Sequence, residues 1–103
     1  MCPALEFLSI MRPKRFDFLT TMTAEEKAVM ERHQAYARNL FEQGKIIVGG
    51  VAKDGAIGIL VLRVDSPDEA REIYDHDPAV QAEVGNTELH PFRLRMLAGP
   101  GVR

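Results

Sequence analysis

Residues 54–69, DGAIGILVLRVDSPDE, decide the fold because they place a turn, a strand and a helix start in direct succession. Asp54-Gly55 is a strong turn signal. Ile57 to Val64 is a nearly continuous apolar run, which predicts a strand buried on both faces. Ser66-Pro-Asp-Glu69 then predicts a helix start, with Ser66 and Glu69 forming a capping box and proline at the first helical position.

Two strands are predicted upstream of this stretch. Leu5 to Met11 carries apolar residues on both faces, so it also requires cover on both sides. Ile46 to Val51 is the second, interrupted by Gly49-Gly50, and it precedes the Asp54-Gly55 turn. The two strands on either side of that turn therefore predict a hairpin.

A long helix is predicted between the first two strands. Thr23-Ala-Glu-Glu26 is a capping box, and Gly44 is a favourable residue just past a helix end. One stripe is apolar and includes His33 at its centre: Val29, Met30, His33, Tyr36, Ala37, Leu40 and Phe41. The other side is polar: Lys27, Glu31, Arg32, Arg38, Asn39, Glu42 and Gln43. His33 is therefore expected to face the sheet.

The chain downstream of Ser66 predicts a second helix, a short turn and a last strand. The helix should stop near Asp77, because Pro78 disfavours the helical conformation before it. Asp77 is also a candidate cap for a turn over Pro78 to Ala82. The last strand is expected over Glu88 to Leu97, at a sheet edge, because Pro91 lies inside it.

The element order is therefore βαββαβ, which favours an α+β, ferredoxin-like fold with a four-stranded antiparallel sheet. Right-handed crossovers put both helices on one face of the sheet. The other face is apolar, and a two-fold homodimer with sheets packed face to face is the simplest cover. We expect one domain over residues 1–103, with a core at about 5–97 and a loose tail at 98–103.

Net charge, cysteine content and the N-terminal sequence limit the kinds of partner and cellular location that we expect. The 103 residues carry a formal net charge of −2, which argues against a general nucleic-acid or membrane-surface binder. The single cysteine, Cys2, cannot form a disulfide within one chain, and it lies outside any environment that would activate it. The N-terminus has no signal-peptide pattern, so we expect a cytoplasmic protein.

His33 is the leading candidate for chemistry, with two interpretations. It is either a core histidine whose nitrogens are hydrogen-bonded, or a proton-shuttling base. A leucine would fill the same position without burying a polar group, which favours the second interpretation. Asp77, at the sheet-facing end of the neighbouring helix, is placed to fix the imidazole tautomer, although it could instead be only a helix cap.

Four other residues are candidate substrate contacts, each with a structural alternative. Tyr36, one turn from His33, is a candidate for hydrogen bonding a developing oxyanion or is core filler. Asp54 is a candidate contact or only a turn residue. Arg12 and Arg15 belong to a basic connection that either clamps an anionic substrate or is a solvated loop.

Other chemistries are not indicated. His33, His76 and His90 lack zinc-site spacing, and Asp75-His76-Asp77 alone is a weak metal signal, so we expect no metal site. No nucleotide-binding or hydrolase motif is present, and we expect no cofactor. RNA-recognition domains share the element order, but the strand Ile57 to Val64 has no aromatic ring on which a base could stack.

Several short motifs, taken in order, resemble the YCII-related (YciI-like) family. They are His33-Gln-Ala-Tyr36, Leu40, Gly44-Lys-Ile46, Gly49-Gly50, Ser66-Pro-Asp-Glu-Ala70, Asp77-Pro78 and Pro91-Phe92. The resemblance implies a dimeric α/β barrel with a cleft in each subunit, and it carries the family's active-site histidine and aspartate onto His33 and Asp77. The sequence departs from the pattern at Gly50, where a Gly-Pro pair is usual, and at Glu83-Val84-Gly85. Both departures are expected to flank the cleft.

Most members of that family have no assigned reaction, and the few understood ones resemble lyases or dehalogenases of chlorinated hydroxyaromatic compounds. Muconolactone isomerases are similar in fold. We therefore expect a small enzyme, without metal or cofactor, in which His33 moves a proton on a small cyclic or hydroxyaromatic compound. The alternative is a non-catalytic ligand-binding or assembly module with a structural histidine.

Overall fold

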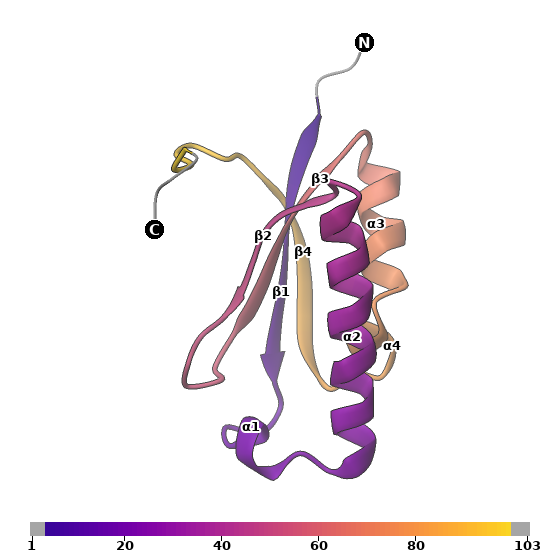
Figure 1. Ribbon diagram of the computed structural model, residues 1–103, viewed down its shortest axis with the longest axis vertical. Helices are drawn as coiled ribbons and strands as arrows, with labels where there is room; N and C mark the ends of the chain where they lie inside the picture. The colour runs from indigo at the N-terminus through magenta and orange to yellow at the C-terminus, as the bar shows by residue number, and fades with distance from the viewer. Residues whose placement is uncertain (1–3, 100–103) are drawn as a thin grey trace.

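Four strands form one antiparallel sheet in the order β2-β3-β1-β4, and three helices pack on one of its faces (Figure 1). This computed structural model describes residues 4–99; the predictions made for Cys2 and for the tail at 100–103 fall outside that range. In chain order the elements are β1 (Leu5–Pro13), α1 (Phe18–Thr21), α2 (Ala24–Glu42), β2 (Ile46–Val51), β3 (Gly58–Val64), α3 (Pro67–Asp75), α4 (Pro78–Gln81) and β4 (Gly85–Phe92).

The predicted α+β, ferredoxin-like architecture is confirmed. The four strands and the two long helices follow each other as βαββαβ, and β4 occupies an edge of the sheet as its Pro91 requires. The short helices α1 and α4 are additions to this order. No helix within residues 4–99 is long and apolar enough to span a bilayer.

The helix starts follow their local sequence closely. At α2, the Thr23 hydroxyl accepts the Glu26 N–H and the Glu26 carboxylate accepts the Thr23 N–H, which is the predicted capping box. At α3, Ser66 accepts the Glu69 N–H, but the Glu69 carboxylate accepts from the backbone of Asp65 and from Lys45 instead. The second capping box is therefore only half formed, because the Glu69 carboxylate accepts from Asp65 and Lys45 and not from the Ser66 N–H.

The last strand differs from its predicted bounds. It begins at Gly85, earlier than expected, because Gly85 pairs with Pro13 at the end of a longer β1. A Cβ at this position would lie 2.4 Å from the Arg12 carbonyl oxygen, so only glycine fits the close approach. The strand ends at Phe92, opposite Glu6, because β1 itself begins at Leu5 and offers no further partner.

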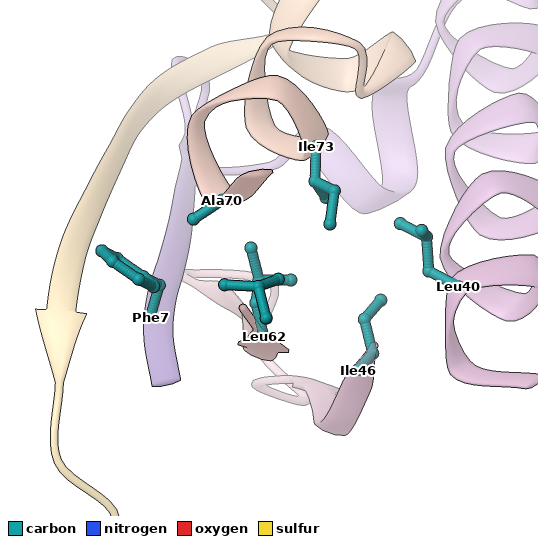
Figure 2. Close-up of a cluster of buried hydrophobic side chains, with 7 residues drawn as sticks. Phe7, Leu40, Ile46, Leu62, Ala70 and Ile73 are labelled. Atoms are coloured by element: carbon teal, nitrogen blue, oxygen red, sulfur yellow. The ribbon is translucent and has the colours of Figure 1, made fainter. Parts of the chain in front are cut away.

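The main core lies between the sheet and helices α2 and α3. Figure 2 shows Leu40 of α2 and Ile73 of α3 projecting toward Leu62, at the centre of the cluster. Leu62 is 1% exposed and belongs to β3, one of the two central strands. The buried members of the cluster are Phe7, Leu40, Ile46, Leu62, Val64, Ala70 and Ile73.

The opposite face of the sheet has an apolar centre and a charged margin. Residues paired across neighbouring strands share a face, so Ile10 and Ile59, like Leu8 and Val61, lie together on the side away from the core cluster. Ion pairs lie around them, joining Glu6 to Arg63 and Arg12 to Glu88, and a hydrogen bond joins His90 to Glu88. The helices that pack on the sheet, α2, α3 and α4, lie on the other side from this face (Figure 1), where Ile10 and Val61 are already buried and Leu8 and Ile59 are half-buried.

We expect Leu62→Ala to lower the free energy of unfolding by about 2–5 kcal/mol, because truncation leaves a cavity in a fully packed position. Urea denaturation followed by circular dichroism measures the change. Leu97→Ala is the matched control, because Leu97 is 58% exposed and the same atoms are removed from a site in contact with water. Equal losses in the two variants would contradict the assignment of the core.

Candidate functional site

His33 and Asp77 form a hydrogen-bonded pair that joins α2 to the start of α4. The His33 Nδ1 lies 2.7 Å from the Asp77 Oδ1, and the two side chains are 20% and 7% exposed. With the carboxylate as acceptor, Nδ1 carries the proton, and Nε2 is the nitrogen left for another partner. Within residues 4–99, His33 Nε2 makes no hydrogen bond.

Asp77 makes both of the contacts considered for it in the sequence, one with His33 and one that caps a helix. Its Oδ1 accepts the backbone N–H of Ala79 at 2.9 Å, which caps α4, and the same oxygen accepts from His33. A helix cap fixes the side-chain rotamer of the capping residue. The contact with the Ala79 N–H therefore fixes the position of the carboxylate. The hydrogen bond to this carboxylate in turn fixes the orientation of the imidazole ring.

Both residues line one open cleft between α2 and the sheet. The cleft has a volume of about 490 Å³, within the range of small-molecule sites. Its walls come mainly from apolar side chains and glycines, with the hydroxyl groups of Ser9 and Thr87 on the sheet side. The residues that α2 contributes are Met30, His33, Gln34, Ala37, Arg38 and Phe41.

Gln34 and Arg38 are cleft residues that the sequence analysis missed. Arg38 was assigned to the solvated side of the helix, yet it lines the cleft, and so does Gln34. Met30, Gln34, Ala37 and Arg38 follow i, i+4, i+7 and i+8 spacing, so they form a second row beside the core-facing stripe. This spacing is the signal in the sequence that could have identified them.

Tyr36 lies outside the cleft lining. Its hydroxyl donates to the backbone carbonyl of Ile73 at 2.9 Å, which ties α2 to α3. Burial, followed by the charges of Asp77 and Glu72, raises the pKa of Tyr36 above its ordinary value of 10. The tyrosine is therefore a neutral donor that is already engaged, and the structure does not place its hydroxyl where an oxyanion in the cleft would need it.

The other predicted contacts are also absent from the cleft lining. The Asp54 carboxylate accepts the Ala56 N–H at 2.9 Å and so organises the turn between β2 and β3. Arg12 forms an ion pair with Glu88 on the far face of the sheet. Arg15 binds the Glu26 carboxylate at 2.9 Å and lies over the Phe18 ring. Asp54 therefore has the turn role weighed as its alternative, whereas Arg12 lies in β1 and both arginines form ion pairs instead of belonging only to a solvated loop.

The two departures from the family pattern, at Gly50 and at Glu83-Val84-Gly85, lie at different places relative to the cleft. Gly50 lines the cleft, where a Cβ would meet no atom within 4 Å, so the site does not require glycine there. Glu83-Val84-Gly85 lies outside the lining, so the expectation that both departures flank the cleft is correct only for Gly50. Glu83 adopts a left-handed backbone with φ of 54°, which is unusual for a residue with a side chain.

No group of three or more His, Cys, Asp or Glu side chains is arranged to hold a metal ion in the described part of the chain. The charged residues that line the cleft are His33, Asp77 and Arg38. An imidazole with a free nitrogen and a fixed carboxylate behind it can accept and return a proton. The arrangement is therefore suited to general acid–base chemistry on a small molecule.

The fold and the cleft together define an α+β, ferredoxin-like protein with a histidine–aspartate pair in its cleft. The YCII-related domain model matches residues 7–93, and the chain belongs to that family. No curated protein sequence matches the chain.

Among solved structures, the chain is similar to 5-chloro-2-hydroxyhydroquinone dehydrochlorinase from Burkholderia phenoliruptrix, in complex with 2,5-dihydroxybenzoquinone. The match has a TM-score of 0.56 and 21% identity, and it covers 84% of this chain and 93% of the other. At this identity the likeness establishes a shared fold.

The Arg15–Glu26 pair gives a prediction about acid stability. The hydrogen bond from Arg15, followed by that from the Thr23 N–H, lowers the pKa of Glu26 from 4.5 to about 2. A carboxylate with a lowered pKa stabilises the fold above its unfolded value and loses that contribution as the pH falls. We expect Glu26→Gln, which can still cap the helix, to unfold at lower urea concentration than the wild type at pH 7.

This difference between Glu26→Gln and wild type should shrink as the pH falls from about 4.5 toward about 2. Urea midpoints measured at several pH values test it. Glu31→Gln is the control, because Glu31 is exposed on the same helix and forms no ion pair with residues 4–99. A difference that stays constant down to pH 2 would show that the Arg15 contact does not act through the charge of Glu26.

Proposed function

We propose that this protein is a general acid–base enzyme in which His33 moves a proton on a small cyclic or hydroxyaromatic compound. The observation that carries the proposal is the 2.7 Å contact between His33 and Asp77 at the wall of an open, largely apolar cleft. A core histidine with only a packing role would not need a cleft of about 490 Å³ beside it.

The proposed step uses the free nitrogen of His33. Nε2 removes a proton from a substrate carbon next to a carbonyl or enol, and the C–H electron pair moves into the ring as an enolate. The proton then returns at another atom, which is isomerisation. Alternatively, the enolate electron pair forms a new double bond, chloride leaves with the electron pair of the C–Cl bond, and Nε2 releases its proton to water, which is elimination. Asp77 holds the Nδ1–H tautomer and stabilises the positive charge of the imidazole while it carries the proton.

The substrate class is supported by the walls of the cleft and by the structural relative. The walls are largely aliphatic, which suits a ring better than a sugar or a nucleotide. The relative is named for dehydrochlorination of a chlorinated hydroxyhydroquinone, and it was solved with a dihydroxybenzoquinone. With Tyr36 engaged by α3, Ser9 is our candidate for binding a substrate oxygen, because its hydroxyl lines the cleft.

One observation favours a second candidate function, a non-catalytic ligand-binding module. The Asp77 oxygen that accepts from His33 also caps α4, so the pair ties two helices together whether or not it moves protons. In that case the cleft would bind a small molecule without turnover, and His33 would be structural. Replacement of His33 distinguishes the two functions.

We expect the wild type to accelerate exchange of the ring hydrogens of 2,5-dihydroxybenzoquinone for deuterium, as measured by proton NMR in D₂O. His33→Gln should lower this rate by about 10²–10⁴-fold, the usual contribution of a positioned acid–base group. Asp77→Asn should also lower the rate while preserving the fold, because asparagine caps helices as well as aspartate does.

His76→Gln is the matched control, because His76 lies outside the cleft lining and its Nδ1 is 2.7 Å from the Glu72 carbonyl oxygen of its own helix. This variant should exchange at the wild-type rate. Turnover by His33→Gln at the wild-type rate, or no acceleration by the wild type over buffer, would reject the catalytic proposal. Binding of the quinone without exchange would instead support the ligand-binding module.

We further propose that two chains associate through the sheet faces that lie away from the helices, and that the assembly is cytoplasmic. Association would bury Leu8 and Ile59, which are half-buried in the single chain, over the already buried Ile10 and Val61, and the ion pairs around them would form the polar rim. Burial of an apolar patch of this kind is the usual driving force for association.

Sedimentation equilibrium should give twice the chain mass of 11.5 kDa. Ile59→Lys, which places a charge in the proposed interface, should shift the protein toward the single-chain mass. Lys53→Ala, in the turn between β2 and β3, is the surface control and should leave the mass unchanged. A wild type that sediments as a single chain at micromolar concentration would reject the dimer.

A further inference from the structure

We infer that Arg38 is a specificity-determining residue, and that the substrate carries an anionic oxygen substituent on the part of the ring nearest the cleft mouth. The inference rests on the proposed function for its ring-shaped substrate, and it adds a charge to that substrate.

Arg38 is placed to bind a ligand and is not engaged elsewhere. It lines the cleft, yet it forms no ion pair and no side-chain hydrogen bond within residues 4–99. Four of the eight arginines in that range have a carboxylate partner. These are Arg12, Arg15, Arg63 and Arg71, which pair with Glu88, Glu26, Glu6 and Asp75.

The ionisable side chains of the cleft form two separate groups, the His33–Asp77 pair and Arg38. At one end, His33 and Asp77 pair with each other. Arg38 is the remaining charged residue of the described lining, and it is exposed, which places it toward the mouth. A neutral ring would leave the guanidinium without a partner, whereas an anionic substituent would form charge-assisted hydrogen bonds with it.

The spacing along α2 fits a ring between the two ends. Arg38 follows His33 by five residues, which is a rise of about 7.5 Å along the helix axis. Helical side chains lean toward the N-terminus, so the guanidinium is carried back along the cleft toward His33. One six-membered ring with a substituent would therefore reach from the imidazole to Arg38.

Apolar side chains beside Arg38 complete the mouth. Phe41, one turn further along α2, is 59% exposed, and Val51 at the end of β2 is 64% exposed; both line the cleft. An aromatic ring would cover these surfaces while its anionic group reaches the guanidinium. A ring with a carboxylate or phenolate oxygen satisfies both features, and an uncharged ring satisfies only one.

Binding of two matched compounds tests the inference. 4-Hydroxybenzoate carries a carboxylate, and 4-hydroxybenzamide is an uncharged compound of nearly the same shape. We expect isothermal titration calorimetry to give the wild type about fivefold tighter binding of the acid at low salt, a modest factor because Arg38 is exposed. The preference should shrink at about 0.5 M salt, which screens an exposed pair.

Arg38→Met should abolish the preference by weakening binding of the acid while leaving binding of the amide unchanged. Arg38→Lys should retain part of it, because lysine keeps the charge and loses the two-pronged geometry. Arg32→Met is the matched control, since Arg32 is exposed on the same helix but does not line the cleft. This control should preserve the wild-type preference.

Different negative results would reject the role of Arg38 and the proposed acid–base role of His33. Equal binding of acid and amide by the wild type would overturn the role of Arg38 and leave proton transfer by His33 standing. A preference that survives Arg38→Met would also overturn it, because the imidazole would then be the group that recognises the anion. Binding of neither compound would overturn the substrate class, while loss of deuterium exchange in His33→Gln would continue to support the acid–base chemistry.

Discussion

One oxygen atom, the Asp77 Oδ1, organises this end of the molecule. It accepts the Ala79 N–H and the His33 Nδ1, at 2.9 and 2.7 Å, so the start of α4 and the middle of α2 are fixed to the same point. Without the cap, the carboxylate could choose other rotamers, and the imidazole would lose its orientation. The geometry of the cleft therefore depends on a helix start as much as on the residues that face the ligand.

The fold could be predicted from the sequence because its determinants are local. The Thr23 capping box, the Asp54-Gly55 turn and the apolar run of β3 each act within a few residues, and the order of elements then leaves few ways to build the sheet. The end of β4 could not be predicted, because it depends on where β1 begins in space. The partner of Glu69 was missed for the same reason, since Lys45 reaches it from a distant part of the chain.

The site was predictable only in part. A histidine in an apolar stripe and an aspartate before a proline are visible in the sequence, and the fold brings them together. Arg38 was missed because a helical projection separates apolar from polar residues, while a cleft needs both. Arg12 was placed at the cleft, although it has the same strand parity as Leu8 and Ile10 and so points to the other face. The predicted strand ended at Met11, so strand alternation was not applied to Arg12, which lies in the longer observed β1.

The alternation of β1 and β3 also bears on how such a protein can diverge. Ser9 of β1 and Leu60 of β3 line the cleft, while their neighbours Leu8 and Val61 pair on the opposite side of the sheet. Successive residues along one strand thus serve different functions, one at the cleft and the next on the opposite face of the sheet. Point replacements can retune the chemistry of such a domain without disturbing its assembly, whereas a single-residue insertion in either strand would exchange the two sets of side chains and damage both at once.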